Sequence, residues 1–127
     1  MKPLQTAFAA ITLAALSTQA RAVTEDNFLA KTTGDVIALC SPTESDSMKT
    51  AAINFCHGFV VGAYRVLAQQ DEALGASKPF CPPATLPSRN EAIANFIQWA
   101  KSNPSVNALP PTDGMLKFLM ANYPCGK

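Results

Sequence analysis

The stretch AINFCHGFVVGAYRVL, residues 52–67, carries apolar residues at three- and four-residue spacing. This spacing places side chains on one side of an α-helix. The first apolar set is Ala52, Phe55, Cys56, Phe59, Ala63, Val66 and Leu67, and a second set, Ile53, Val60, Val61 and Tyr64, widens the stripe onto a neighbouring face. The pattern therefore predicts a helix that other elements must cover on two sides.

Two glycines, Gly58 and Gly62, lie inside this predicted helix. A glycine in a helix interior is less favourable than alanine by about 1 kcal/mol, so another interaction must offset both positions. We expect a neighbouring backbone to approach the helix closely along this side. Asn54, His57 and Arg65 argue against a membrane-embedded helix pair built on the Gly-x-x-x-Gly spacing.

Prolines divide the rest of the chain into windows that can hold helices, because proline is excluded from helix interiors. The proline-free windows are 43–78, 88–103 and 112–123. The segments 71–87 and 101–111 are the longest irregular stretches, and the first is rich in proline, which favours a shaped connection.

Helix start signals support these windows and add a short helix over residues 33–40. Thr33 is its predicted N-cap, Ser88 and Glu91 form a capping-box pattern, and Thr112 is the predicted N-cap of the last helix. The last helix is predicted to turn Met115, Leu116, Leu119, Met120 and Tyr123 inward. No window alternates apolar and polar residues, so the predicted fold is all-α, a small compact bundle of about four helices.

The N-terminal residues 1–22 have the pattern of a cleavable signal peptide. Lys2 precedes an apolar run, and Ala20-Arg21-Ala22 gives a small-x-small cleavage site before Val23. Removing Lys2 and Arg21 with this segment leaves one domain of 105 residues, 23–127, and changes the net charge from +1 to −1. The sequence shows no further apolar run of spanning length, so we expect no membrane insertion after cleavage and a periplasmic location.

Four cysteines lie in the predicted mature domain, an even number that favours two disulfides in an exported protein. Three pairings are possible, and spacing favours Cys40 with Cys56 and Cys81 with Cys125. Zinc is the competing use of cysteine. However, the chain has no Cys-x-x-Cys, and its single histidine, His57, is adjacent to Cys56 rather than at ligand spacing.

The residue inventory argues against catalysis and against nucleic-acid binding. A helical Cys56-His57 pair diverges by about 100° and cannot form a catalytic dyad, and no second histidine exists to serve another nucleophile. Ten basic and nine acidic residues give no electrostatic footprint for nucleic acid. We therefore predict a protein that is not an enzyme and needs no metal or cofactor.

Several short motifs together resemble the Rap/Tai immunity proteins of bacterial type VI secretion. They are Ala38-Leu39-Cys40, the segment Phe55-Cys56-His57-Gly58-Phe59-Val60-Val61-Gly62, Phe80-Cys81-x-Pro83, Asn103-Pro104 at a helix end, and Tyr123-Pro124-Cys125. The resemblance covers about residues 33–125. It implies a small, disulfide-bonded helical protein of the periplasm, commonly a homodimer. Members bind peptidoglycan amidase toxins of the papain-like type and occlude their catalytic cleft.

The residues that contact such a toxin are predicted in the 69–80 connection, because loops between cross-linked helices are free to carry function. The candidate polar contacts are Gln70, Asp71, Glu72, Ser77 and Lys78. The alternative, from a different class, is a periplasmic chaperone or stress-response protein that holds unfolded clients on exposed apolar faces. A hydrolase is disfavoured, because only carboxylates remain for the chemistry.

Overall fold

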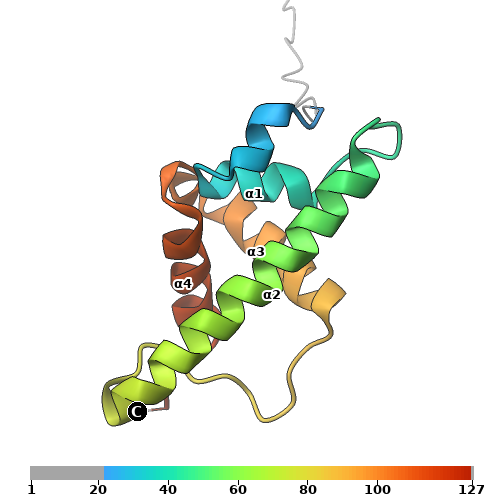
Figure 1. Ribbon diagram of the computed structural model, residues 1–127. Coiled ribbons are helices and arrows are strands. Elements are labelled where there is room, and N and C mark those ends of the chain that lie inside the picture. Colours follow the sequence, from blue (N-terminus) through green and yellow to red (C-terminus); the bar gives the residue numbers. More distant parts are fainter. Residues whose placement is uncertain (1–21, 127) are drawn as a thin grey trace, which may run out of the picture.

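The computed structural model describes residues 22–126, and in this part of the chain the fold is all-α, as predicted (Figure 1). The predicted signal peptide, residues 1–22, lies outside the described residues except for Ala22. Four α-helices and three short 3-10 turns follow one another without a strand in the described range. They are η1 (Glu25–Leu29), α1 (Thr33–Cys40), α2 (Lys49–Leu74), η2 (Gly75–Ser77), α3 (Arg89–Ser102), η3 (Pro104–Ala108) and α4 (Pro111–Asn122).

The short helix α1 contacts η1, α2, α3, η3 and α4, more elements than any other helix. Its Val36 and Leu39 are completely buried. The helix begins with a capping box in which the Thr32 side chain accepts a hydrogen bond from the Asp35 amide. The predicted N-cap, Thr33, is wrong by one residue, because Thr33 is buried inside the first turn.

The close helix approach that glycine permits occurs at Gly114 of α4. A Cβ atom added there would lie 2.6 Å from Thr33 Cγ2 and 2.9 Å from Thr33 Cβ. The prediction of such an approach at Gly58 and Gly62 is wrong within the monomer, since a Cβ atom at either position meets none of the described residues within 4 Å. Both glycines face away from the other helices.

The longest helix, α2, runs diagonally across the bundle in Figure 1 and buries Ala52, Cys56 and Val60 against the core. It continues to Leu74 and ends at Gly75, whose φ of 58° suits glycine. The predicted loop start at residue 71 is therefore wrong, because residues 71–74 contain no glycine or proline that would end the helix.

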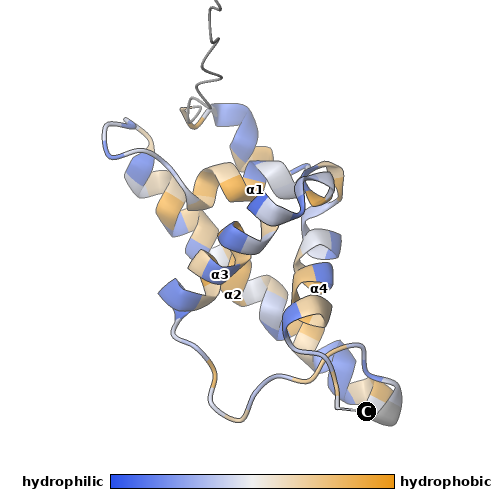
Figure 2. Cartoon of the chain, turned by 180° about the vertical axis from the view of Figure 1, so that it is seen from behind, coloured by the Kyte–Doolittle hydropathy of each residue, from blue (hydrophilic) through white to orange (hydrophobic). Residues whose placement is uncertain are grey.

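By length and apolar composition, α2 alone among the described helices could cross a membrane, contrary to our expectation that no such run follows the signal peptide. Its Ala52, Cys56 and Val60 belong to a core shared with the other helices, and Cys56 is cross-linked to α1. We therefore interpret α2 as a core helix whose exposed side carries Ala51 and Val66 as well as the polar Asn54 and Arg65. Figure 2 shows hydrophobic residues over its N-terminal half and hydrophilic residues near its C-terminal end.

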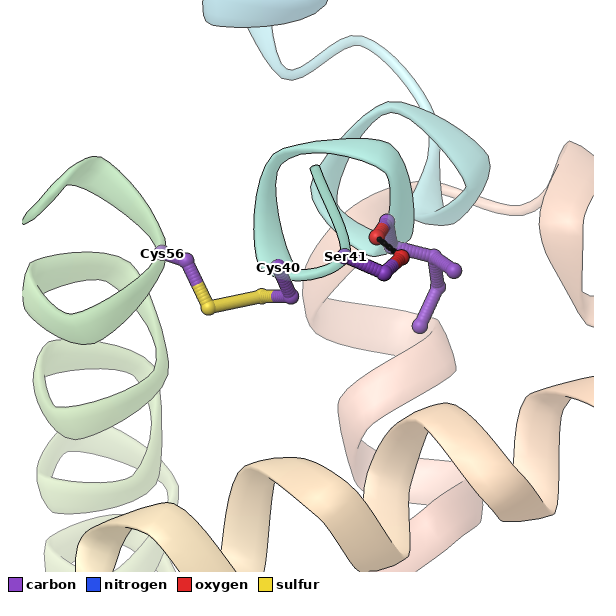
Figure 3. Close-up of a disulfide and its surroundings, with 4 residues drawn as sticks. Cys40, Ser41 and Cys56 are labelled. Carbon is purple, nitrogen blue, oxygen red and sulfur yellow. Dashed lines mark hydrogen bonds between the residues drawn. A yellow bond between two sulfur atoms is a disulfide. The ribbon is translucent and has the colours of Figure 1, made fainter. Parts of the chain in front are cut away.

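Two disulfides cross-link the bundle in the predicted pairing. Cys40 at the end of α1 is bonded to Cys56 of α2, with their Cα atoms 5.1 Å apart (Figure 3). The second bond joins Cys81 to Cys125, with a Cα separation of 4.7 Å, and ties the C-terminal segment to the chain that leaves α2. Ser41, next to the first bond, donates from its hydroxyl to the Ile37 carbonyl at the C-terminal end of α1.

The helix α3 begins at the predicted capping box, in which the Ser88 hydroxyl accepts from the Glu91 amide and the Glu91 carboxylate accepts from the Ser88 amide. It buries Ile93, Phe96 and Ala100. Ile97 is half-buried at the edge of this apolar stripe.

The helix α4 begins with Pro111 in its first turn and has no side-chain cap, so the prediction of Thr112 as N-cap is wrong. Met115 and Leu119 are buried as predicted, but Met120 is 45% exposed. Phe118, absent from the predicted set, is buried and contacts the rings of Phe96, Trp99 and Tyr123 at centroid distances of 5.3, 5.7 and 6.2 Å. Phe118 lies on the same side as Met115, three residues earlier.

Candidate partner-binding surface

The residues predicted to contact a partner lie at the C-terminal end of α2 and just beyond it. Gln70 and Glu72 are exposed on its last turns, Ser77 ends η2, and Lys78 follows it, also exposed. These four side chains are accessible on one continuous segment. Two of them are on a helix rather than on the predicted loop, so their spacing is fixed by the helix geometry.

Asp71 differs from its neighbours because it is only 4% exposed. Its Oδ1 atom is buried without a hydrogen-bond partner among the described residues. On a helix, residue 71 shares a side with Leu67 and Tyr64, which pack against the core. The Asp71 carboxylate therefore lies on the inward side of α2 and is not an accessible polar contact in this conformation.

The Cys81–Cys125 bond holds the end of this segment against the C-terminal residues. The Cys81 amide donates to the Tyr123 carbonyl (N–O 2.7 Å), and Cys125 Sγ lies 3.7 Å from the Lys78 carbonyl oxygen. Lys78, Cys81 and Tyr123 are thus fixed relative to one another. This arrangement determines where the following proline-rich loop starts.

That loop, residues 78–88, runs along the lower edge of the molecule in Figure 1. It lines one side of an apolar groove between α2, α3 and α4. The groove has a volume of about 170 Å³. Its lining comes from all three helices, the loop and the chain after α4: Val60, Val61, Tyr64, Pro82, Pro83, Leu86, Pro87, Arg89, Ala92, Phe96, Met115, Phe118, Leu119 and Tyr123. A dry cavity of about 150 Å³ is sufficient for a benzene ring, so the groove has room for one aromatic or branched side chain.

Three lining residues give the groove its polar groups. Tyr64 is half-buried, and burial raises the pKa of its hydroxyl, with the neighbouring Tyr123 adding to the shift. Tyr64 therefore stays protonated at neutral pH and can donate a hydrogen bond. Arg89, in the first turn of α3, is exposed, and no carboxylate among residues 22–126 lies within ion-pair distance of its guanidinium. The groove thus combines apolar walls with a positive charge that no carboxylate of residues 22–126 neutralises.

A second candidate surface is the outer side of α2. Gly58 and Gly62 leave it open, and Val66 on the same helix is 54% exposed. The two glycines are one helical turn apart and lie above one another on this side. The outer side therefore has two positions without a side chain, with Asn54 and Arg65 exposed beside them, and can accept another helix at short distance.

The described residues offer few groups for chemistry. All four cysteines are in disulfides, so none supplies a thiolate. His57 is half-buried on α2. Within the part of the chain that the structure covers, no cluster of three or more His, Cys, Asp or Glu residues could hold a metal ion.

Comparison with known protein families matches residues 32–125 to the sequence model of the Rap1a immunity proteins. The chain belongs to the Rap1a immunity protein family. The matched part begins at the N-cap of α1 and ends at Cys125, so it contains all four α-helices and both disulfides of this Rap1a family member. No curated protein and no solved structure matches the chain.

Membership of the Rap1a family indicates an immunity role toward an effector, which requires that the protein bind a toxin partner. The groove was missed by sequence reasoning, because its lining comes from segments far apart in the chain. The available signal was the cluster of prolines at 79–87, which indicated a shaped loop without showing what lies beneath it.

Proposed function

We propose that the mature chain is a periplasmic immunity protein that binds a type VI secretion peptidoglycan amidase and occludes its catalytic cleft. The observation that carries this proposal is the family match over residues 32–125, which includes both disulfides. Protection of this kind needs a rigid binding surface and no chemistry of its own. A cross-linked protein loses less conformational entropy when it binds, which favours tight inhibition.

The periplasmic location is supported by two features of the chain. The signal-peptide pattern of residues 1–22 implies export with cleavage before Val23, leaving one domain over 23–127. Both disulfides require an oxidising compartment to form and persist. The peptidoglycan substrate of the proposed toxin is in the same compartment.

For the toxin contact we propose the groove together with the end of α2. Pro82 and Tyr123 line the groove and are each one or two residues from the Cys81–Cys125 bond, whose Cys125 sulfur also contacts the Lys78 carbonyl. An apolar side chain of the toxin would fill the groove, and an acidic residue of the toxin beside it would pair with Arg89. Gln70, Glu72, Ser77 and Lys78 would form the polar rim. Interfaces of this type obtain most of their affinity from one or two anchors in a pocket.

We also propose that the outer side of α2 joins two copies of the chain into a homodimer. Gly58 and Gly62 leave room there for a second helix. Because the same surface is present on both copies, a two-fold arrangement would pair it with itself. The dimer would leave the groove, on the inner side of α2, free for the toxin.

The test is titration of a peptidoglycan amidase encoded next to this protein with the purified, oxidised mature chain. Inhibition should be complete at a fixed molar ratio, as expected for occlusion. An amidase rate that does not change in excess protein would refute the proposed target. Prevention of aggregation of an unrelated unfolded protein, without amidase inhibition, would instead favour the chaperone alternative.

The contact surface is tested by filling the groove. Ala92→Phe places a ring in the groove that Ala92 lines and should weaken inhibition at least about tenfold, which corresponds to loss of one modest anchor of about 1.4 kcal/mol. Ala94→Phe is the matched control, because Ala94 is exposed on α3 and does not line the groove. Equal inhibition by both variants would place the toxin elsewhere while leaving the immunity function intact.

A further inference from the structure

The backbone nitrogen of Val23 contacts a carboxylate that is distant in sequence. It donates a hydrogen bond to Asp46 with an N–Oδ2 distance of 2.7 Å. Val23 itself is 7% exposed and belongs to the hydrophobic core, whereas Ala22 before it is exposed. The chain therefore enters the folded domain at Val23, with its nitrogen directed at Asp46.

Asp46 uses its other oxygen to organise the start of α2. Its Oδ1 accepts from the Met48 amide at 2.8 Å, and its carbonyl accepts from the Lys49 amide at 3.1 Å. Met48 is the N-cap of α2 and offers no side-chain acceptor. Asp46 thus connects the N-terminal residue of the domain to the first turn of its longest helix.

The nitrogen that contacts Asp46 belongs to the bond that signal-peptide cleavage is predicted to break. Hydrolysis of the Ala22–Val23 peptide bond by a signal peptidase consumes one water molecule. The Ala22 carbonyl carbon takes the hydroxyl and becomes a carboxylate, while the Val23 nitrogen becomes an amine and is protonated at neutral pH. A neutral amide at this position is thereby replaced by a charged ammonium group.

We propose that cleavage after Ala22 frees an α-ammonium group at Val23 that forms an ion pair with Asp46 and locks the N-terminal segment onto the start of α2. Hydrogen bonds between two charged groups are shorter and about twice as strong as those between neutral groups. The burial of Val23 also limits the screening that weakens fully exposed pairs. The ion pair forms only after export, in the compartment where the two disulfides form. This maturation step does not depend on the identity of the toxin.

The test compares three forms of the oxidised chain that all contain the described fold. The first begins with a free amine at Val23, the second is N-acetylated at Val23, and the third retains Ala22. Acetylation removes the positive charge, and the added residue moves it to Ala22. In both forms the Val23 nitrogen is a neutral amide, so we expect each form to have a Tm lower by about 5 °C than the chain that begins at Val23. Equal Tm values for the three forms would overturn the proposal, as would an exported protein whose N-terminal sequence does not begin at Val23.

Two variants assign the difference to Asp46. In Asp46→Asn the three forms should melt within about 1 °C of one another, because the charged partner is gone while an oxygen for the Met48 amide remains. Glu44→Gln is the matched control, since the Glu44 side chain is 92% exposed on the same turn and pairs with Lys49. This variant should keep the full difference between the forms. A difference that persists in Asp46→Asn would place the ammonium's partner elsewhere and contradict the proposal.

Discussion

Gly114 and Thr33 meet where α4 approaches α1, and this contact leaves no room for a larger residue. Thr33 is completely buried, and its hydroxyl lies 3.0 and 3.1 Å from the carbonyl oxygens of Leu109 and Pro110. Its amide also donates to the Leu109 carbonyl at 2.8 Å. Thr33 therefore cannot move away from α4 without losing these bonds. The residue pair fixes how close the two helices lie.

We expect Gly114→Ala to destabilise the protein by about 1–3 kcal/mol, because the added methyl group overlaps Thr33. The effect should exceed the gain of about 1 kcal/mol that alanine brings to a helix interior. Urea unfolding of the oxidised chain measures the change. Thr112→Ala is the control on the same helix, because Thr112 is exposed and makes no cap bond, and it should alter stability by less than about 0.5 kcal/mol. Wild-type stability of Gly114→Ala would show that α1 and α4 are farther apart.

At the scale of helices, features set by local sequence signals could be predicted, whereas features set by contacts between helices could not. The start of α3 was predicted to the residue, because the Ser88 and Glu91 pattern is satisfied entirely within one turn. The end of α2 was missed because the predicted irregular segment began at residue 71, whereas the helix continues to Gly75, the glycine that gives the local stop signal. The glycine contact was assigned to the wrong helix, because helical spacing identifies a small residue without showing what lies opposite it.

The candidate site was predictable only in its polar part. The exposed positions Gln70, Glu72, Ser77 and Lys78 follow from a connection rich in polar residues. Burial of Asp71 did not, because it depends on α2 continuing past residue 70 and turning that side chain inward. The groove depends on the distances between α2, α3 and α4, which no local pattern specifies.

The outer side of α2 gives a prediction about assembly. Gly58→Leu should leave the monomer folded, with an unchanged helical spectrum, because no atom of residues 22–126 lies within 4 Å of a Cβ at this position. It should prevent close approach of a second α2, so the mass in solution should fall from dimer to monomer. Light scattering after size exclusion measures the mass. Ala73→Leu, at an exposed position near the end of α2, is the control and should remain a dimer. An unfolded Gly58→Leu chain would indicate internal packing instead.

For the whole molecule, the two disulfides differ in their relation to the core. Cys40 and Cys56 are 6% and 0% exposed and lie among the buried residues, whereas Cys81 and Cys125 are only partly buried at the edge of the bundle. Loop length alone would make the more exposed Cys81–Cys125 bond the more stabilising of the two. In the chain-entropy model, closing 16 residues contributes about 3 kcal/mol and closing 44 residues about 4 kcal/mol. Access to a reductant, however, depends on exposure of the sulfur atoms.

We therefore expect a low concentration of dithiothreitol to reduce Cys81–Cys125 first, while Cys40–Cys56 stays oxidised until the domain unfolds. Alkylation followed by mass spectrometry of peptides identifies which thiols appear, and circular dichroism on the same samples reports the helices. Because Pro82 and Tyr123 of the groove are held by the outer bond, the partly reduced protein should keep its helices yet inhibit the proposed amidase several-fold less. Cys81→Ser/Cys125→Ser should reproduce this state without reductant. Earlier labelling of Cys40 and Cys56 would contradict the assigned order, and full inhibition by the double variant would show that the outer bond does not shape the toxin contact.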